Sequence, residues 1–359
     1  MNKKIFFSAG GTGGHIFPAI NLMKHFLDKK YKVVLITDNR GKNLIKNYSE
    51  FQSYILNVDT PTNKNLLNKL FSYFTIFYSI LKSILILKKE KPSLIFGFGG
   101  YVSFPISFAS KFFKLPLIIY ENNMILGRAN KYLSSFSKKI LLGKNIKNNF
   151  PEKYKKKIHV VGAILNKDII NFSPLKTKNN RDFFSVLVLG GSQGAKVFGT
   201  IIPDVIKMVK DTGYEIEVNQ QCILAQKNSL IDFYKRNNIK SYIFEFQKNI
   251  LQLILSSNLV ITRCGASTIA ELAHTSTPFI GVPLPHSIDN HQYLNAKYYE
   301  NKGCCWLLEQ TNFNTNSLFN LIIENIKNKN KLDHVKSNMK KIYNKDVYGN
   351  IENAIKEFI

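Results

Sequence analysis

The segment Lys4–Ile20, with the sequence KIFFSAGGTGGHIFPAI, contains the first residues whose types and spacing are suited to chemistry. It predicts a short apolar strand, a glycine-dense turn that carries Thr12 and His15, and a helix that opens near Pro18. Glycine lets a backbone approach a ligand closely, and the N-terminus of the following helix offers free amides to an anion. The turn is either a ligand loop or a tight turn that binds nothing, and its own pattern does not decide between them.

Glycine-rich junctions of this kind follow four predicted strands. They are Gly10–His15, Gly97–Tyr101, Gly190–Ala195 and Gly265–Thr268. Ligands of open α/β sheets bind at the carboxyl ends of the strands, where such junctions lie. Two domains of this type that face each other would bring the four junctions around one cleft. Any one junction could be a plain turn, but the four together predict a binding cleft.

The junction within Arg263–Ala273, RCGASTIAELA, is the most informative of the four. The amides of Ala266–Thr268, at the start of a predicted helix, can hold a diphosphate without a metal. Glu271, one turn further on, is placed to accept two hydrogen bonds from a ribose diol. The alternative is a Ser or Thr N-cap with Glu271 completing a capping arrangement. The polar run HSIDNHQYLNA (286–296) follows the next strand and offers groups suited to sugar hydroxyls.

Short apolar strands that alternate with longer helical stretches must position these junctions. After the first strand, the segments that contain predicted strands are 31–37, 53–58, 93–100, 117–123, 139–143, 159–162, 184–195, 214–219, 242–246, 258–268, 278–285 and 304–309. The alternation predicts βαβ crossovers. The expected fold class is α/β, with two Rossmann-like domains whose parallel sheets face a central cleft. The expected domains are 1–162 and 163–343, with a helix over 344–359 that packs back on the first domain.

The chain has 359 residues and a formal net charge of +26. This charge has three explanations: nucleic-acid binding, attraction to an anionic membrane, or a composition shifted toward Lys, Asn and Ile. The lysines are spread along the chain and do not form the basic stripe of a nucleic-acid-binding module, so a shifted composition explains much of the excess. The four cysteines form no CxxC pair or disulfide framework, which fits a reducing compartment. No signal peptide is expected before the first strand.

The segment Leu66–Lys91 predicts a long helix that is rich in aromatic residues. Lys69 and Lys82 interrupt its apolar run, so we do not expect it to span a membrane. It is either a helix packed in the core or an apolar surface that docks on anionic lipid. The lysines expected to ring that surface are Lys64, Lys69, Lys82, Lys88, Lys89 and Lys91.

Six motifs occur in the order and spacing of one family. They are GGTGGHIFPA, GFGGYVSFP, ENN, GGSQGA, RCGASTIAEL and DNHQYLNA. Over essentially its whole length the chain resembles the MurG glycosyltransferases. The resemblance implies a GT-B fold and an inverting transfer of N-acetylglucosamine from UDP to the C4 hydroxyl of a lipid-linked muramyl-pentapeptide. That reaction turns lipid I into lipid II in peptidoglycan synthesis.

The resemblance also implies the partners of the chain. They are UDP-N-acetylglucosamine, lipid I and the anionic surface of the bacterial inner membrane, at whose cytoplasmic face the protein would be peripheral. Nucleic acid is not among the expected partners. We expect neither a metal nor a cofactor, because helix amides can stabilise a leaving diphosphate and the chain has no Asp-x-Asp motif.

The same motifs imply roles for individual residues. Those implied to bind the donor are Thr12, Gly13, Gly14, Asn123, Ser192, Gln247, Ala266, Ser267, Thr268, Ile269, Ala270, Glu271 and Gln292. On the acceptor side they are Gly99, Gly100 and Tyr101, and His15 is the implied catalytic group. Within the donor set, 266–268 match a diphosphate-binding helix start, Glu271 a ribose ligand and Gln292 a ligand of sugar hydroxyls. Ser192 matches a serine of the UDP pocket, and Gln247 stands where the family's backbone pairs with uracil.

The chain departs from the family pattern at three places. After the interdomain glycine, residues 163–166 read Ala-Ile-Leu-Asn where the family has Asn-Pro-Val-Arg, so an arginine expected near the donor is absent. Cys264 stands in place of the usual serine of RSGA, and the segment 219–222 lacks the usual glycine. These departures bear on donor affinity more than on the type of reaction.

Two questions stay open at the level of sequence. His15 is either the general base that takes the proton of the acceptor hydroxyl or a group that only positions the sugar or the diphosphate. On fold alone the chain is also compatible with another GT-B UDP-sugar transferase, a UDP-N-acetylglucosamine epimerase or a dinucleotide dehydrogenase. The motif GGYVS argues against the first two, and the acid of ITDNRGK comes too early after its strand for a dehydrogenase.

Overall fold

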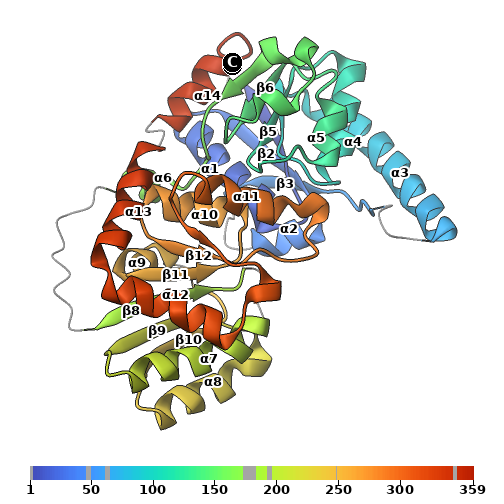
Figure 1. Cartoon of the computed structure of the whole chain (residues 1–359). Coiled ribbons are helices and arrows are strands. Elements are labelled where there is room, and N and C mark those ends of the chain that lie inside the picture. The colour runs from blue at the N-terminus through green and yellow to red at the C-terminus, as the bar shows by residue number, and fades with distance from the viewer. Residues whose placement is uncertain are drawn as a thin grey trace. The chain divides into compact units, whose positions relative to one another are not determined.

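The computed structural model shows two α/β units, each built on its own parallel sheet (Figure 1). It describes residues 3–45, 50–60, 65–172, 183–191, 196–247, 249–342 and 346–359. Unit 1 comprises Met1–Asn166 together with Asn344–Ile359, and unit 2 comprises Lys167–Tyr343. The predicted fold class, α/β with two domains on parallel sheets, is confirmed.

Unit 1 contains a seven-stranded parallel sheet with the strand order β3-β2-β1-β4-β5-β6-β7. Its strands are β1 (Lys4–Ser8), β2 (Lys32–Thr37), β3 (Gln52–Ile55), β4 (Leu94–Gly97), β5 (Leu117–Glu121), β6 (Lys139–Leu142) and β7 (Ile158–Val160). Strands β4 and β5 are buried along their full length, as expected for a parallel sheet covered on both faces. In the core, Phe7 stacks on Phe96 with ring centroids 5.3 Å apart.

The helices of unit 1 include one whose start matters for the site. They are α1 (Gly13–Asp28), α2 (Asn39–Leu44), α3 (Leu66–Glu90), α4 (Ser103–Ala109), η1 (Ser110–Phe113), α5 (Arg128–Leu133), η2 (Lys147–Asn149), η3 (Glu152–Lys157) and α14 (Val347–Ile355). The predicted opening of the first helix near Pro18 is wrong, because α1 begins at Gly13. The amides of His15 and Ile16 already donate to the Thr12 carbonyl. His15 therefore lies in the first turn of α1.

Unit 2 contains a six-stranded parallel sheet with the order β10-β9-β8-β11-β12-β13. Its strands are β8 (Phe184–Leu189), β9 (Ile216–Gln221), β10 (Lys240–Phe244), β11 (Leu259–Thr262), β12 (Phe279–Gly281) and β13 (Trp306–Leu307). Its helices are α6 (Lys167–Ile170), α7 (Lys196–Asp211), α8 (Leu224–Arg236), α9 (Ile250–Ser256), α10 (Ala266–His274), η4 (Ile288–Asn290), α11 (His291–Glu300), η5 (Gln310–Asn312), α12 (Thr315–Lys327) and α13 (Lys329–Lys341). The predicted strands thus each fall within or beside an observed one.

The segment 163–166 belongs to unit 1, so the predicted domain boundary after Gly162 is too early. Two buried tyrosines hold this segment. The Tyr120 hydroxyl donates to the Gly162 carbonyl at 3.2 Å and accepts the Ile164 N–H at 3.0 Å. The Tyr348 hydroxyl, on α14, donates to the Leu165 carbonyl at 2.7 Å. Helix α14 therefore holds residues 163–166, the last residues of the segment Met1–Asn166, in unit 1.

Helix α14 is itself attached to α1. The Glu352 carboxylate lies 2.5 Å from His25 Nε2 and 2.5 Å from Lys29 Nζ. The Tyr348 ring stacks on the His25 ring with centroids 4.5 Å apart. These contacts explain why 346–359 is part of unit 1 although the chain enters it from unit 2.

Replacing Tyr348 by Phe tests the fastening role of its hydroxyl. The substitution leaves the buried Leu165 carbonyl without its donor, so we expect the free energy of unfolding to fall by about 1–3 kcal/mol. Urea denaturation measures this, with Tyr132→Phe as the matched control, since the Tyr132 side chain is exposed. Equal midpoints for Tyr348→Phe and the wild type would contradict the role.

Candidate functional site

The turn between β1 and α1 is held by a carboxylate. Gly11 has a φ of +81°, a conformation that glycine adopts without strain. The Asp38 carboxylate accepts the Gly11 N–H at 3.2 Å and the Gly41 N–H at 2.8 Å. Thr12 is the extended N-cap of α1, and its side chain makes no capping bond. Because the first amides of a helix have no intrahelical acceptor, the turn presents backbone donors beside His15.

The His15 ring packs against the second glycine-rich junction of unit 1. Gly99 and Gly100 have φ values of +88° and +77°. A Cβ placed on Gly99 would lie 3.2 Å from His15 Cε1, and one on Gly100 would lie 3.5 Å from His15 Cδ2. Gly99 is therefore required by backbone conformation and by the approach of the imidazole, and Gly100 by backbone conformation and by the Gly10 carbonyl oxygen, which would lie 3.1 Å from a Cβ there. Of the four predicted junctions, the structure brings together the two that lie in unit 1.

Glu121, at the end of β5, accepts four hydrogen bonds although it is buried. Its Oε1 accepts the Asn123 backbone N–H at 3.0 Å and Asn123 Nδ2 at 2.8 Å. Its Oε2 accepts the Gly127 N–H at 3.0 Å and Asn130 Nδ2 at 3.1 Å. The sequence prediction named Asn123 but missed Glu121 and Asn130. The run ENN after an apolar strand was the available signal for Glu121.

A buried lysine lies beside this carboxylate. Lys144 Nζ donates to the Asn122 carbonyl at 2.8 Å. Burial lowers the pKa of Lys144 to about 8, and the Glu121 charge opposes that shift. The backbone after β5 is thus bound at two points. The Glu121 carboxylate accepts the Asn123 N–H, and the Lys144 ammonium group donates to the Asn122 carbonyl. Sequence analysis did not single out Lys144.

In unit 2 the start of α10 has the form expected of an anion site. Gly265 is its N-cap, in extended conformation, and no side chain caps the helix within the part of the chain that the structure describes. The alternative of a Ser or Thr N-cap completed by Glu271 is therefore wrong. Ser267 Oγ is buried and has no hydrogen-bond partner among the described residues. The helix N-terminus thus offers uncapped amides and a hydroxyl to a ligand.

Glu271 lies one turn further along α10 and is partly buried. Burial raises the pKa of its carboxyl from the ordinary 4.5 to about 7. The carboxylate makes no hydrogen bond within the part of the chain that the structure describes. Hydrogen bonds from the hydroxyl groups of a ligand would stabilise the charged form of such a buried carboxylate.

The Gln292 side chain is oriented by two backbone amides. Its Oε1 accepts the Cys264 N–H at 3.2 Å and the Leu284 N–H at 3.0 Å. Since both partners are donors, the oxygen must face them, and the amide nitrogen remains to donate. Asn295 Nδ2 donates to the Cys264 carbonyl at 3.3 Å. The loops after β11 and β12 are thereby joined through α11.

Arg263 supports the same loops through its guanidinium group. It is buried, and its guanidinium donates to the Val282 and Pro283 carbonyls at 3.1 and 3.2 Å and to Gln310 Oε1 at 2.6 Å. Its Cζ also lies 4.9 Å from the centre of the Phe198 ring.

The other predicted site residues differ in what they offer. Ser192 lies outside the described residues. Ile269 and Ala270 are buried in the core of unit 2, so only their backbones can serve a ligand. Gln247 follows β10, next to Phe246, whose side chain is 73% exposed. An exposed aromatic ring can offer a nucleobase a face to stack on, and Phe246 was not among the residues singled out from the sequence.

Comparison with known proteins agrees with the geometry of both units. Residues 5–142 match the Glycosyltransferase family 28 N-terminal domain, and residues 185–350 match the corresponding C-terminal domain. The chain is 39% identical to a Rickettsia canadensis protein over 99% of this chain and 100% of that protein. It is 36% identical to a Pelagibacter ubique protein over 98% and 97% of the two chains. Both relatives are named UDP-N-acetylglucosamine–N-acetylmuramyl-(pentapeptide) pyrophosphoryl-undecaprenol N-acetylglucosamine transferase.

The chain belongs to the MurG family of glycosyltransferases. The fold agrees with this assignment. The crystal structure of Acinetobacter baumannii MurG superposes with a TM-score of 0.79 over 99% of both chains, at 23% identity. The MurG resemblance predicted from the six motifs is therefore confirmed.

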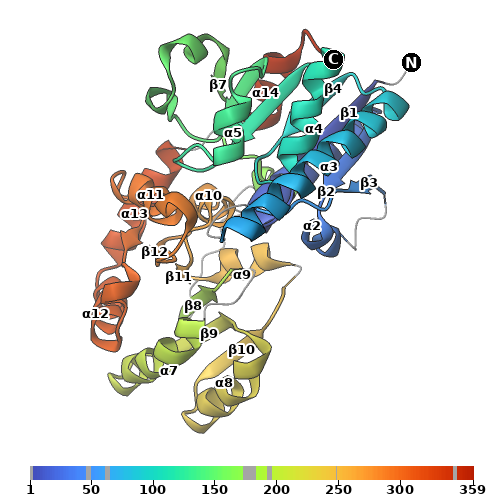
Figure 2. The ribbon, with the colours of Figure 1, turned by 90° about the vertical axis from the view of Figure 1, so that its right-hand side faces the viewer.

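Helix α3 gives this MurG-family chain an apolar surface. In Figure 1 the helix projects from unit 1, and in Figure 2 it lies along α4, which it contacts. Its exposed apolar residues are Leu66, Leu67, Leu70, Phe71, Tyr73, Phe74, Phe77, Tyr78, Leu81 and Leu85. The interpretation of this segment as a core-packed helix is therefore wrong. Among the described residues, α3 is also the one helix that is long and apolar enough to cross a membrane.

The other face of α3 is bound to unit 1 through polar groups. Ser72, Ser79 and Ser83 are buried there. The Ser79 hydroxyl donates to the Asn57 carbonyl at 3.1 Å, and Lys82 Nζ donates to the Ile55 carbonyl at 3.0 Å. Such side contacts fit a helix that lies against its own domain. Of the lysines predicted to ring the surface, Lys64 lies outside the described residues, and the exposed ones are Lys69, Lys82, Lys88, Lys89 and Lys91.

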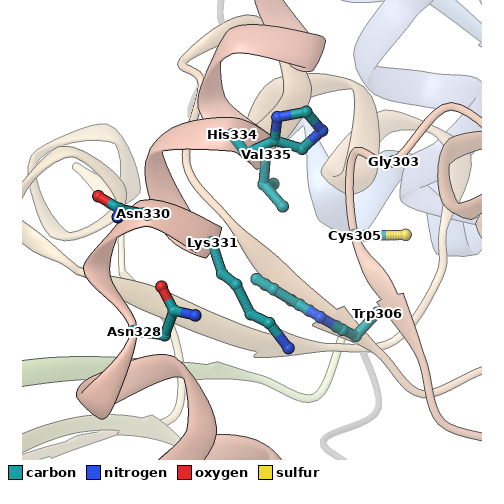
Figure 3. Close-up of a pocket in the computed structure, with 8 residues that line it drawn as sticks. All are labelled: Gly303, Cys305, Trp306, Asn328, Asn330, Lys331, His334 and Val335. Atoms are coloured by element: carbon teal, nitrogen blue, oxygen red, sulfur yellow. The ribbon is translucent and has the colours of Figure 1, made fainter.

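A pocket of about 420 Å³ lies between β13 and α13 of unit 2 (Figure 3). Its lining residues are Gly303, Cys305, Trp306, Asn328, Asn330, Lys331, His334 and Val335. None of them belongs to the predicted MurG site. Among the described residues, no group of three or more His, Cys, Asp or Glu side chains is arranged to hold a metal ion.

The raised pKa of Glu271 predicts a pH-dependent stability. Between about pH 4.5 and 7 the folded chain keeps a proton that the unfolded chain has released, so wild-type stability falls as the pH rises through this window. Glu271→Gln removes this titration. The variant should be more stable than the wild type by up to about 3 kcal/mol above pH 7 and equal to it below about pH 4.5.

Urea denaturation at several pH values measures the difference. The raised pKa would be contradicted if the difference in unfolding free energy between Glu271→Gln and the wild type did not change with pH. It would also be contradicted if the wild type became more stable relative to the variant as the pH rises.

Proposed function

We propose that this chain transfers N-acetylglucosamine from UDP-N-acetylglucosamine to the C4 hydroxyl of the muramyl sugar of lipid I, forming lipid II for peptidoglycan synthesis. The observation that carries the proposal is the full-length likeness, at 36–39% identity, to transferases named for this reaction. The arrangement of polar groups in each unit supports it.

Unit 2 holds the donor in this proposal. The uncapped amides and Ser267 hydroxyl at the start of α10 bind the diphosphate, where the helix dipole also favours negative charge. Glu271 accepts hydrogen bonds from the ribose hydroxyls. Gln292 donates to a sugar oxygen, because its own oxygen already accepts from Cys264 and Leu284. Phe246 and the backbone at Gln247 receive the uracil.

Unit 1 supplies the acceptor side. His15, in the first turn of α1 and against Gly99 and Gly100, takes the proton of the C4 hydroxyl. The C4 oxygen forms a bond to the anomeric carbon of the donor sugar while the bond from that carbon to the UDP oxygen breaks. UDP leaves with the bonding electron pair, and the helix α10 amides stabilise its charge. The displacement inverts the configuration of the anomeric carbon.

The apolar face of α3 docks on the membrane that contains the lipid acceptor. Its exposed Leu, Phe and Tyr side chains enter the interface, and Lys69, Lys88, Lys89 and Lys91 attract anionic headgroups. The protein is then peripheral on the cytoplasmic face of the inner membrane. The even spread of lysines along the chain argues against nucleic acid as the anionic partner.

A transfer assay tests the reaction. Radiolabelled UDP-N-acetylglucosamine and a lipid I analogue should give a labelled lipid-linked disaccharide and one UDP for each sugar transferred. Epimerised nucleotide sugar in the absence of acceptor, with no labelled lipid in its presence, would assign the chain to the epimerases instead.

Replacing His15 by Ala tests the general base. Turnover should fall roughly 10²-fold or more, because the acceptor hydroxyl loses its proton acceptor. The same assay measures kcat and KM, with His334→Ala as the control, since His334 is exposed on α13. A change confined to KM would show that His15 only positions the substrate.

Replacing Phe71, Phe74 and Phe77 together by Ser tests the docking surface. The loss of three exposed rings should weaken vesicle binding by at least about tenfold. Flotation with vesicles that contain or lack phosphatidylglycerol measures binding, with Leu224→Ser on α8 as the control. Equal recovery with both vesicle types would refute the electrostatic part, and undiminished binding of the triple variant would refute the apolar part.

A further inference from the structure

The Asn130 side chain contacts both the Glu121 carboxylate and Gly99, against which the His15 ring packs. It is fully buried, and its Nδ2 donates to the Tyr120 carbonyl at 3.0 Å and to Glu121 Oε2 at 3.1 Å. A Cβ placed on Gly99 would lie 3.3 Å from Asn130 Nδ2 and 3.2 Å from His15 Cε1. The Asn130 amide and the His15 ring therefore both lie against Gly99, where a Cβ would crowd both of them.

The asparagine at this position carries a cost as well as two hydrogen bonds. Asn130 Oδ1 is buried and has no hydrogen-bond partner among the described residues. An unsatisfied buried acceptor costs about 1–3 kcal/mol, a cost that an apolar side chain of similar size would not have. The two hydrogen bonds from Nδ2 help to satisfy the buried Glu121 carboxylate and the Tyr120 carbonyl, and the same amide also lies against Gly99, beside the His15 ring.

We propose that Asn130 is a positioning residue that fixes the Gly99 backbone and, through it, the orientation of the His15 ring. This inference rests on the proposed function. Because Asn130 is fully buried, it does not touch substrate and acts through its neighbours. Glu121 extends the alignment, since its other oxygen binds Asn123 through both the backbone N–H and Nδ2. The Glu121 carboxylate therefore binds Asn123 through one oxygen and Asn130, the residue that positions His15, through the other.

A double-mutant cycle tests the connection to His15. Asn130→Ala should lower kcat by about tenfold in the wild-type background and by less than about twofold in the His15→Ala background, because the residue acts only through the imidazole. An equal loss in both backgrounds would overturn the proposal. Asn130→Leu, which keeps the volume of the side chain, should behave in the same way and guards against a variant that fails to fold.

The matched control is Asn325→Ala in unit 2. Asn325 is also fully buried, donates from Nδ2 to a backbone carbonyl and has an unpartnered Oδ1 among the described residues. It should lower stability without any coupling to His15. If Asn325→Ala were coupled to His15→Ala as strongly as Asn130→Ala is, the coupling would reflect a general loss of stability, and the proposal would be contradicted.

A spectroscopic readout separates this inference from the proposed function. In histidine-labelled protein, Asn130→Ala should shift the ring resonances of His15, and Asn325→Ala should leave them in place. Unchanged His15 resonances in Asn130→Ala would overturn the positioning role even in an active enzyme. If the wild type transferred no sugar, the proposed function would fail, while a His15 shift would still support the contact through Gly99.

Discussion

All strands within each sheet run in the same direction, and this constraint determines where the polar chemistry of the chain lies. Every parallel strand ends at the same edge of its sheet, so loops that are distant in sequence become neighbours. In unit 1 the ends of β1 and β4 bring the His15 ring against Gly99. In unit 2 the ends of β11 and β12 present the Cys264 and Leu284 amides to one oxygen of Gln292.

Features that depend on local pattern were predictable from sequence. Apolar runs located the strands, and glycine clusters located the junctions, because both follow from residues adjacent in the chain. The exposure of α3 was not predictable, since a helix with an apolar stripe has the same periodicity in a core and on a surface. Its buried serines, bonded to backbone carbonyls such as that of Asn57, show which face packs. The start of α1 at Gly13 was also missed, because proline inside a helix resembles proline at its first turn.

Features that depend on tertiary contacts escaped sequence analysis. The run ENN indicated Asn123 but not the role of Glu121, and Asn130 belongs to no motif. The part that both residues play follows only from the four donors around one buried carboxylate. The domain boundary moved for the same reason, since Tyr348 reaches Leu165 from the far end of the chain. Buried polar groups that have no partner among the described residues, such as Ser267 Oγ, mark where the fold is not optimised for stability alone.

The central claim is a single direct displacement, with a base on unit 1 and a diphosphate site on unit 2. It requires that the α-linked donor sugar become β-linked in the product. Proton NMR of the anomeric hydrogen in the lipid-linked disaccharide measures this most directly. A β linkage to the C4 oxygen is the result that the account predicts. An α linkage would demand a second displacement or a different mechanism, and would contradict the assignment of His15 as the base of a single step.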